Sequence, residues 1–244
     1  MTQPTPCNGG PSVMPVDREQ WFRRLSLSNF VNSYYQYRDL QQVENCRKVL
    51  IVGPGQGLDT QVLKWRDYEV TTLDIDATFQ PDLVGSVHDL SHFSDLQFDA
   101  VIASHVLEHL PEFYLDGSLK ELARVARYSL IYLPVHRRHF HLRVVPGFKD
   151  IDFSVILDIF NPFERPDGTT PKYMEGQHYW EVGMRGYRVR DLIKRMSAFF
   201  QVISVYRNKD WISSQNFVLK SKFDARRAMQ TVPPAGSVSL GIQG

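Results

Sequence analysis

The chain has 244 residues, a formal net charge of +1 and two cysteines. This length is enough for one α/β domain with a sizeable core. The nearly balanced charge excludes a global field that attracts nucleic acid or an anionic membrane, and two cysteines cannot form a disulfide framework. No apolar run approaches the ~20 residues that span a bilayer, and the first residues lack the order of a signal peptide. We therefore expect a cytoplasmic protein without membrane attachment.

Both ends of the sequence are rich in Pro, Gly, Ser or Thr, a composition typical of disordered segments. We expect disordered tails at residues 1–16 and 223–244, and a single domain at residues 17–222. Within that domain, apolar runs alternate with amphipathic segments, which is the pattern of a parallel sheet covered by helices. The expected helices are 17–42, 58–66, 116–127 and 188–198, and the expected strands are 48–53, 69–74, 82–86, 98–104, 128–134, 199–207 and 215–222.

The connection between the last two expected strands is only a short turn around residues 208–214, too short for a crossover helix. These two strands must therefore be antiparallel. The predicted fold is Rossmann-like, with a seven-stranded, mostly parallel sheet, an antiparallel C-terminal hairpin and helices on both faces.

The first expected strand ends in a turn that contains Gly53, Pro54, Gly55 and Gly57. Glycines at such a turn let the backbone approach a ligand and open a helix. The second expected strand ends in Asp74, and an acid at that place accepts hydrogen bonds from ribose hydroxyls. The G-x-G-x-G spacing is one residue tighter than the G-x-G-x-x-G turn of dinucleotide-binding proteins. The two segments together predict a nucleoside pocket.

The fourth expected strand continues into the phrase F-D-A-V-I-A-S-H-V-L-E-H-L at residues 98–110. This phrase resembles motif IV of the type 11 branch of class I S-adenosylmethionine-dependent methyltransferases, and the glycine turn resembles their motif I. The resemblance covers about residues 49–134. It implies a sheet with the seventh strand beside the fifth, and S-adenosylmethionine as the cofactor.

The resemblance also implies roles for the residues that match the family motifs. The glycines would pass under the methionine part and the ribose, Asp74 would hold the ribose hydroxyls, and Ile75 would pack against adenine. Ser86 and Val87 would read the adenine edge. Ser104 and His105, in the motif IV phrase, would border the sulfonium. The expected cofactor-binding residues are Gly53, Pro54, Gly55, Gly57, Asp74, Ile75, Ser86, Val87, Ser104 and His105.

Two positions depart from the family pattern. Ile51 stands where the family has an acid that helps hold the cationic amino end of the cofactor, and Ser86 replaces the acid that reads adenine. A hydroxyl still accepts a hydrogen bond, so the second change keeps the function of the position. Neither departure removes the predicted pocket, although both concern groups that contribute to the affinity for the cofactor.

Residues 135–187 are far longer than a usual connection in an α/β domain, and they are rich in aromatic residues and histidines. Long insertions near strand ends commonly carry substrate contacts, so we expect a cap that binds the methyl acceptor. The phrase from His178 to Glu181, H-Y-W-E, looks like cap segments in methyltransferases of surface-glycan gene sets.

The histidines allow several interpretations. His105, Glu108 and His109 spell H-x-x-E-H, a zinc protease motif when borne on one helix, but His105 is expected at the end of a strand. Together with His136, the same residues form a metal set like that of some O-methyltransferases; we favour a site without metal. Methyl transfer asks little of side chains beyond positioning and a base for a hydroxyl acceptor. The candidate bases are His136 first, then His109 and His178.

The leading hypothesis is methyl transfer from S-adenosylmethionine to a small-molecule or sugar-containing acceptor, giving an O-methyl product on a glycan precursor. Three alternatives remain: a non-catalytic partner subunit that binds the cofactor, an RNA methyltransferase that uses the basic loop at Arg137 and Arg138, and a nicotinamide-dependent dehydrogenase. The balanced charge argues against nucleic acid as the acceptor. The sequence does not indicate an oligomeric state.

Overall fold

The computed structural model describes the central part of the chain in four stretches. The tail expected at residues 1–16 lies outside the described residues, as does all of the second tail except residue 223. Among the described residues, no helix is both long enough and apolar enough to cross a bilayer. The described stretches are residues 25–136, 138–144, 153–159 and 178–223.

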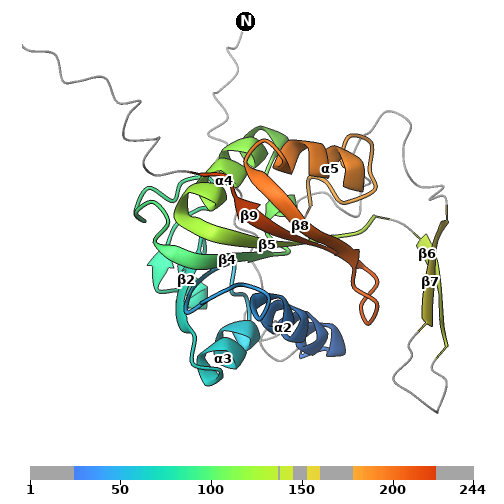
Figure 1. Ribbon diagram of the computed structural model, residues 1–244, viewed down its shortest axis with the longest axis horizontal. Coiled ribbons are helices and arrows are strands. Elements are labelled where there is room, and N and C mark those ends of the chain that lie inside the picture. Colours follow the sequence, from blue (N-terminus) through green and yellow to red (C-terminus); the bar gives the residue numbers. More distant parts are fainter. Residues whose placement is uncertain (1–24, 137, 145–152, 160–177, 224–244) are drawn as a thin grey trace, which may run out of the picture.

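A seven-stranded sheet forms the centre of the domain (Figure 1). Its strands are β1 (Lys48–Val52), β2 (Glu69–Asp74), β3 (Leu83–Val84), β4 (Phe98–Ser104), β5 (Ala126–Pro134), β8 (Phe200–Arg207) and β9 (Ser214–Ser221). They lie in the order β3-β2-β1-β4-β5-β9-β8, and β1 to β5 run parallel. β9 pairs antiparallel with both β5 and β8, so the predicted Rossmann-like fold and its C-terminal hairpin are confirmed.

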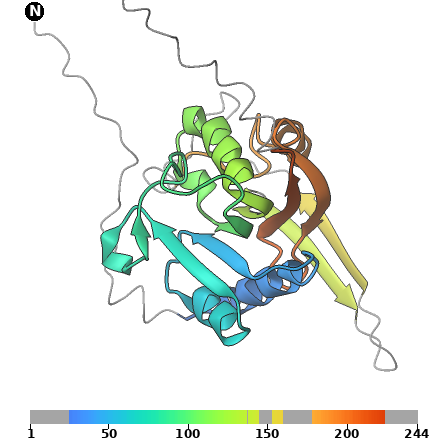
Figure 2. The same ribbon diagram turned by 60° about the vertical axis from the view of Figure 1, so that its left-hand side comes forward.

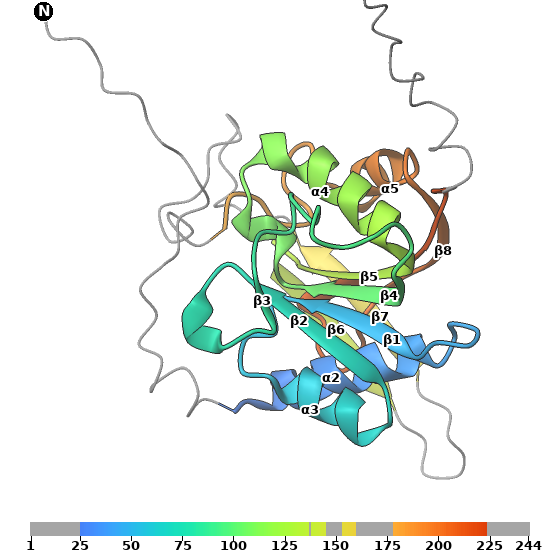
Figure 3. The same cartoon turned by 90° about the vertical axis from the view of Figure 1, so that its left-hand side faces the viewer.

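Helices cover both faces of this sheet, which Figure 3 shows nearly edge-on. α2 and α3 lie on one face, and α4 and α5 lie on the other. The strands between them are apolar on both faces: Val49 and Ile51 pack on the α2 side, whereas Leu50 and Val52 pack on the α4 side. This double burial explains why β1 is an unbroken apolar run. The helices are α2 (Leu27–Leu40), α3 (Leu58–Trp65), α4 (Glu112–Val125) and α5 (Val189–Met196).

Several element boundaries differ from those expected. α2 is shorter than the expected helix at 17–42, of which residues 17–24 lie outside the described part. α4 begins four residues earlier than expected, because Pro111 precedes it and Glu112 lies in its first turn, where the helix dipole favours a carboxylate. It ends at Val125 because Ala126 already pairs within the sheet.

The insertion at residues 135–187 contains a β-hairpin that the sequence analysis did not predict. β6 (Arg138–Val144) and β7 (Phe153–Ile159) pair antiparallel as a separate two-stranded sheet, which stands apart from the main sheet (Figures 1 and 2). The alternation of polar and apolar residues along β6 is the pattern of a strand, so the signal was present in the sequence. Arg137 and the side chain of Arg138, the basic pair of the RNA hypothesis, lie outside the described part.

Candidate functional site

The glycine turn follows β1 at the carboxyl edge of the sheet. Gly53, Gly55 and Gly57 have φ angles of 67°, 50° and 74°, a region that side chains rarely adopt. The amide of Gly53 donates a hydrogen bond to the carbonyl oxygen of Leu73 (2.8 Å), which ties the turn to β2. A Cβ atom at Gly55 or Gly57 would meet open space, whereas one at Gly53 would lie 2.5 Å from Cγ2 of Val106. The turn is therefore open on the side of its second and third glycines.

Asp74 ends β2 beside this turn, because Leu73 pairs with the last residue of β1. Its Oδ1 accepts a hydrogen bond from the amide of Asp76 (2.9 Å), and its carbonyl oxygen accepts one from Gly85 (2.8 Å). Burial raises the pKa of the Asp74 carboxyl above its ordinary value, although the hydrogen bond from Asp76 lowers it. Ile75 is 38 % exposed, so its apolar side chain is accessible next to the acid.

The next strand end holds Ser86 and Val87. The hydroxyl of Ser86 hydrogen-bonds Nδ1 of His88 (2.7 Å), and the His88 ring stacks on Tyr114. The Val87 side chain is buried in the core, so only its backbone is able to contact a ligand. The hydroxyl that replaces the family's acid is thus already engaged with a neighbouring imidazole.

Ile51 is 1 % exposed and packs in the core between the sheet and α2. The position where the family has an acid therefore points into an apolar layer. Pro54, the remaining member of the predicted cofactor set in the turn, accepts a hydrogen bond from the amide of Gly57 (2.8 Å) through its carbonyl oxygen.

β4 ends at Ser104, whose hydroxyl accepts a hydrogen bond from Nδ2 of Asn32 on α2 (2.8 Å). His105 follows with a positive φ of 56°, and its ring lies 4.9 Å from that of Trp211, in the turn between β8 and β9. Burial, together with the nearby His178 and His109, lowers the pKa of His105 to about 3, so this ring is neutral at physiological pH.

Glu108 lies in a short 3-10 helix at Leu107–His109. Its side chain has no exposed surface, and among the described residues neither carboxylate oxygen has a hydrogen-bond partner. Nδ1 of His105 lies 3.6 Å from Oε1, beyond hydrogen-bond distance. Burial raises the pKa of the Glu108 carboxyl to about 8. Because His105 precedes the 3-10 helix, the H-x-x-E-H letters do not share one helix.

The segment that begins at His178 packs against this 3-10 helix. The amide of Tyr179 donates to the carbonyl oxygen of Glu108 (2.8 Å), and the buried Trp180 donates from Nε1 to that of Leu110 (3.2 Å). These two bonds, at adjacent residues, fix the position of the H-Y-W-E phrase. The H-Y-W-E phrase is therefore held at the carboxyl edge of β4, although it follows that strand by about 70 residues in the sequence.

Glu181 joins two histidines of the insertion. Its Oε1 lies 2.6 Å from Nδ1 of His178, and its Oε2 lies 3.1 Å from Nδ1 of His136, which is almost fully buried. Burial raises the pKa of the Glu181 carboxyl, but the hydrogen bonds from the two histidines outweigh this and bring it to about 2. Glu181 is therefore a carboxylate that orients both imidazoles.

The structure thus brings all three candidate bases and Glu108 together at the carboxyl edge of β4 and β5. Sequence reasoning named the histidines but gave no role to Glu181, and it did not place Asn32 or Trp211 at this edge. The His-x-x-Glu spacing of the H-Y-W-E phrase was the available signal for Glu181. We call the following residues the histidine cluster: Glu108, His109, His136, His178 and Glu181.

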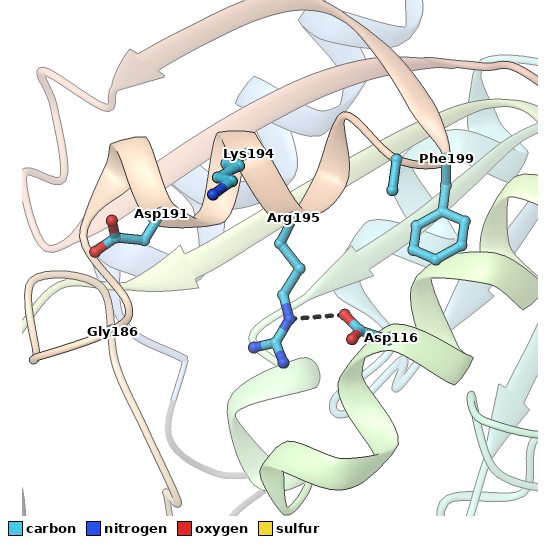
Figure 4. Close-up of a pocket in the computed structure, with 7 residues that line it drawn as sticks. Asp116, Gly186, Asp191, Lys194, Arg195 and Phe199 are labelled. Atoms are coloured by element: carbon cyan, nitrogen blue, oxygen red, sulfur yellow. Dashed lines mark ion pairs between the residues drawn. The ribbon is translucent and has the colours of Figure 1, made fainter.

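A separate surface pocket of about 380 Å³ lies between α4 and α5 (Figure 4). An ion pair between Nε of Arg195 and Oδ1 of Asp116 (2.7 Å) spans it. None of the predicted cofactor-binding or catalytic residues lines this pocket, so it is distinct from the site at the carboxyl edge of the sheet. Its lining residues are Asp116, Gly186, Asp191, Lys194, Arg195, Ala198 and Phe199.

Comparison with known protein families identifies the central part of this chain. Residues 50–129 match a family model described as a methyltransferase domain of type 11. This part of the chain is a class I, S-adenosylmethionine-dependent methyltransferase domain of the type 11 branch. The match begins within β1 and ends within β5, and it includes the glycine turn, Asp74, Glu108 and His109. S-adenosylmethionine is accordingly the cofactor, and methyl transfer is the activity.

Solved structures support the fold of this methyltransferase. The PH0226 protein of Pyrococcus horikoshii OT3 is 15% identical with a TM-score of 0.53, and the match covers 82% of this chain and 94% of that one. A SAM-dependent methyltransferase of Archaeoglobus fulgidus is 15% identical with a TM-score of 0.51, covering 83% and 97%. No curated protein sequence matches the chain significantly. At these identities the likeness concerns the fold alone.

Proposed function

We propose that the methyl group goes to a hydroxyl oxygen of a small-molecule or glycan-precursor acceptor, bound against the insertion at residues 135–187. The single observation that carries this proposal is the histidine cluster, in which Glu181 holds Nδ1 of both His136 and His178. It lies at the carboxyl edge of β4, next to the residues assigned to the sulfonium. A methyltransferase that acts on an already nucleophilic nitrogen needs no such arrangement of bases.

The donor end of the site is proposed to hold S-adenosylmethionine with mostly backbone groups. The open faces of Gly55 and Gly57 would receive the methionine part and the ribose. Asp74 would accept hydrogen bonds from the ribose hydroxyls, and the exposed side chain of Ile75 would pack on adenine. Ser104 and His105 would border the sulfonium.

The acceptor end is proposed to remove the hydroxyl proton as the methyl group is transferred. The sulfonium is already activated, so the remaining requirements are in-line positioning and a base. In the histidine cluster, the carboxylate of Glu181 fixes the proton of the His136 and His178 imidazoles on Nδ1 and leaves Nε2 of each as the basic nitrogen. His136, His109 and His178 are the candidates for this role.

The test is a transfer assay with S-adenosylmethionine labelled in its methyl group. Hydroxylated sugars and sugar nucleotides are compared with matched amino-sugar analogues. We expect label in an ether linkage, and a 10²- to 10⁴-fold lower turnover in His136→Asn with unchanged cofactor affinity. Methylation of the amino analogue alone, at the same rate in the variant, would refute the proposal. Cofactor binding without transfer to any acceptor would favour the non-catalytic subunit instead.

A further inference from the structure

The histidine cluster contains one group that methyl transfer leaves unexplained. Glu108 is fully buried, and neither of its carboxylate oxygens has a hydrogen-bond partner in the described part of the chain. Burial of a carboxylate without a partner is costly unless a proton or a cation neutralises it. Nδ1 of His105, at 3.6 Å from Oε1, is too far away to supply the missing hydrogen bond.

Two nitrogen donors lie next to this carboxylate. One ligand atom each of Glu108, His109 and His178 lies within 4.8 Å of the others. Ligand atoms around a tetrahedral Zn²⁺ with bonds of about 2.1 Å lie about 3.4 Å apart, so an inward shift of about 1 Å suffices. The His109 side chain is exposed and that of His178 is partly exposed, so an ion from solution is able to reach this space.

The surroundings of His178 match those of a metal ligand. Its Nδ1 lies 2.6 Å from the carboxylate of Glu181, which accepts the proton of that nitrogen and leaves Nε2 with a free lone pair. Metal-binding histidines almost always donate their second ring N–H to a carboxylate or a carbonyl in this way. This observation is independent of the missing partner of Glu108, and both point to the same space.

We propose that Glu108, His109 and His178 bind a divalent transition-metal ion through one carboxylate oxygen and two imidazole nitrogens. Two nitrogen donors favour an ion such as Zn²⁺ over Mg²⁺, which prefers oxygen ligands. Three protein ligands leave a coordination position for another oxygen.

The consequence for catalysis rests on the proposed function. A bound ion lowers the pKa of a coordinated hydroxyl, so an acceptor oxygen at the open position would lose its proton more readily. His136, held by the same Glu181 but outside the ligand set, would remain as the nitrogen base. Binding of the ion itself can be measured without donor or acceptor.

The test is a calorimetric titration of the metal-free full chain with Zn²⁺, paired with the absorption spectrum of the Co²⁺ form. We expect one ion per chain, and Zn²⁺ affinity at least about 100-fold lower in Glu108→Gln and His178→Asn. Glu181→Gln, which removes only the orienting carboxylate, is expected to weaken binding about 10-fold to 100-fold. The matched control is His92→Asn, an exposed histidine outside the cluster, which should bind Zn²⁺ like the unaltered chain.

Absence of stoichiometric Zn²⁺ binding would overturn the proposal, as would equal loss in His92→Asn. The unfolding temperature of each metal-free variant shows whether that variant folds. If Glu108→Gln does not fold, His178→Asn, at a partly exposed position, still tests the site. Calorimetry with S-adenosylmethionine on the same samples reports on the donor end. Intact donor binding without Zn²⁺ binding removes the metal site alone and leaves the proposed function standing.

Discussion

The glycine turn after β1 and the histidine cluster occupy the same edge of the sheet but are built in opposite ways. The turn consists of five consecutive residues with three positive φ angles, and it meets its partner Asp74 at the end of the neighbouring strand. The cluster consists of side chains from residues 108–109, 136 and 178–181, joined by hydrogen bonds between distant segments. Backbone shape thus defines the donor end of the site, and titratable side chains define the other end.

The largest expected effect comes from changing backbone shape alone. Gly55→Val places a β-branched residue at a φ of 50°, which favours glycine, and puts a side chain into the open face of the turn. We expect S-adenosylmethionine affinity to fall by about 100-fold or more, since strain and steric exclusion add. Calorimetry measures this. The control is Gly117→Ala in α4, where a Cβ also meets open space; it should leave affinity unchanged.

Asp74→Ala tests the carboxylate that is expected to hold the ribose at the donor end. Loss of a hydrogen bond to a charged group costs about 1.5–3 kcal/mol, so we expect 10- to 100-fold weaker binding of S-adenosylmethionine. Asp116→Ala, which removes a carboxylate from the pocket between α4 and α5, should bind normally. Equal affinity in Asp74→Ala and the unaltered chain would show that this carboxylate does not hold the cofactor.

A smaller effect is expected from Asp59, in the first turn of α3 directly after the glycine turn. Burial raises the pKa of its carboxyl from 3.8 to about 6. Between these values the unfolded chain ionises while the folded chain keeps the proton, so folding stability falls as pH rises. Asp59→Asn lacks this loss and should gain about 2 kcal/mol relative to the unaltered chain between pH 4 and 7. Denaturant unfolding of the variant and the unaltered chain at pH 4 and pH 7 measures this gain. The same difference in unfolding free energy at both pH values would contradict the assignment of Asp59 as a buried acid.

The smallest effect is expected from removal of divalent ions, which tests whether the donor end is independent of the histidine cluster. Removal of divalent ions with a chelator should change S-adenosylmethionine affinity less than about twofold, because the glycine turn offers backbone groups rather than metal ligands. Calorimetry before and after chelation, with Zn²⁺ added back, measures this. A large loss of donor affinity would mean that the two ends are not independent.

The same contrast explains what the sequence could predict. The strands, the glycine turn and Asp74 follow from local patterns, because an apolar run and a glycine spacing carry their own geometry. The cluster could be named only in part, since Glu181 reaches His136 across 45 positions and Trp211 meets His105 only after the C-terminal hairpin forms. The β6–β7 hairpin was not predicted, although β6 alternates regularly and the turn-forming pair Pro146 and Gly147 lies between the two strands in the sequence.

One contact links the two regions directly. Cγ2 of Val106 fills the space that a side chain at residue 53 would need, so the loop that leads to Glu108 rests on the first glycine of the turn. A larger residue at position 106 would press on this glycine, whereas a side chain at position 53 would meet both Val106 and an unfavourable backbone angle. Position 53 should therefore stay glycine among natural homologues, even in those where position 106 carries a smaller residue.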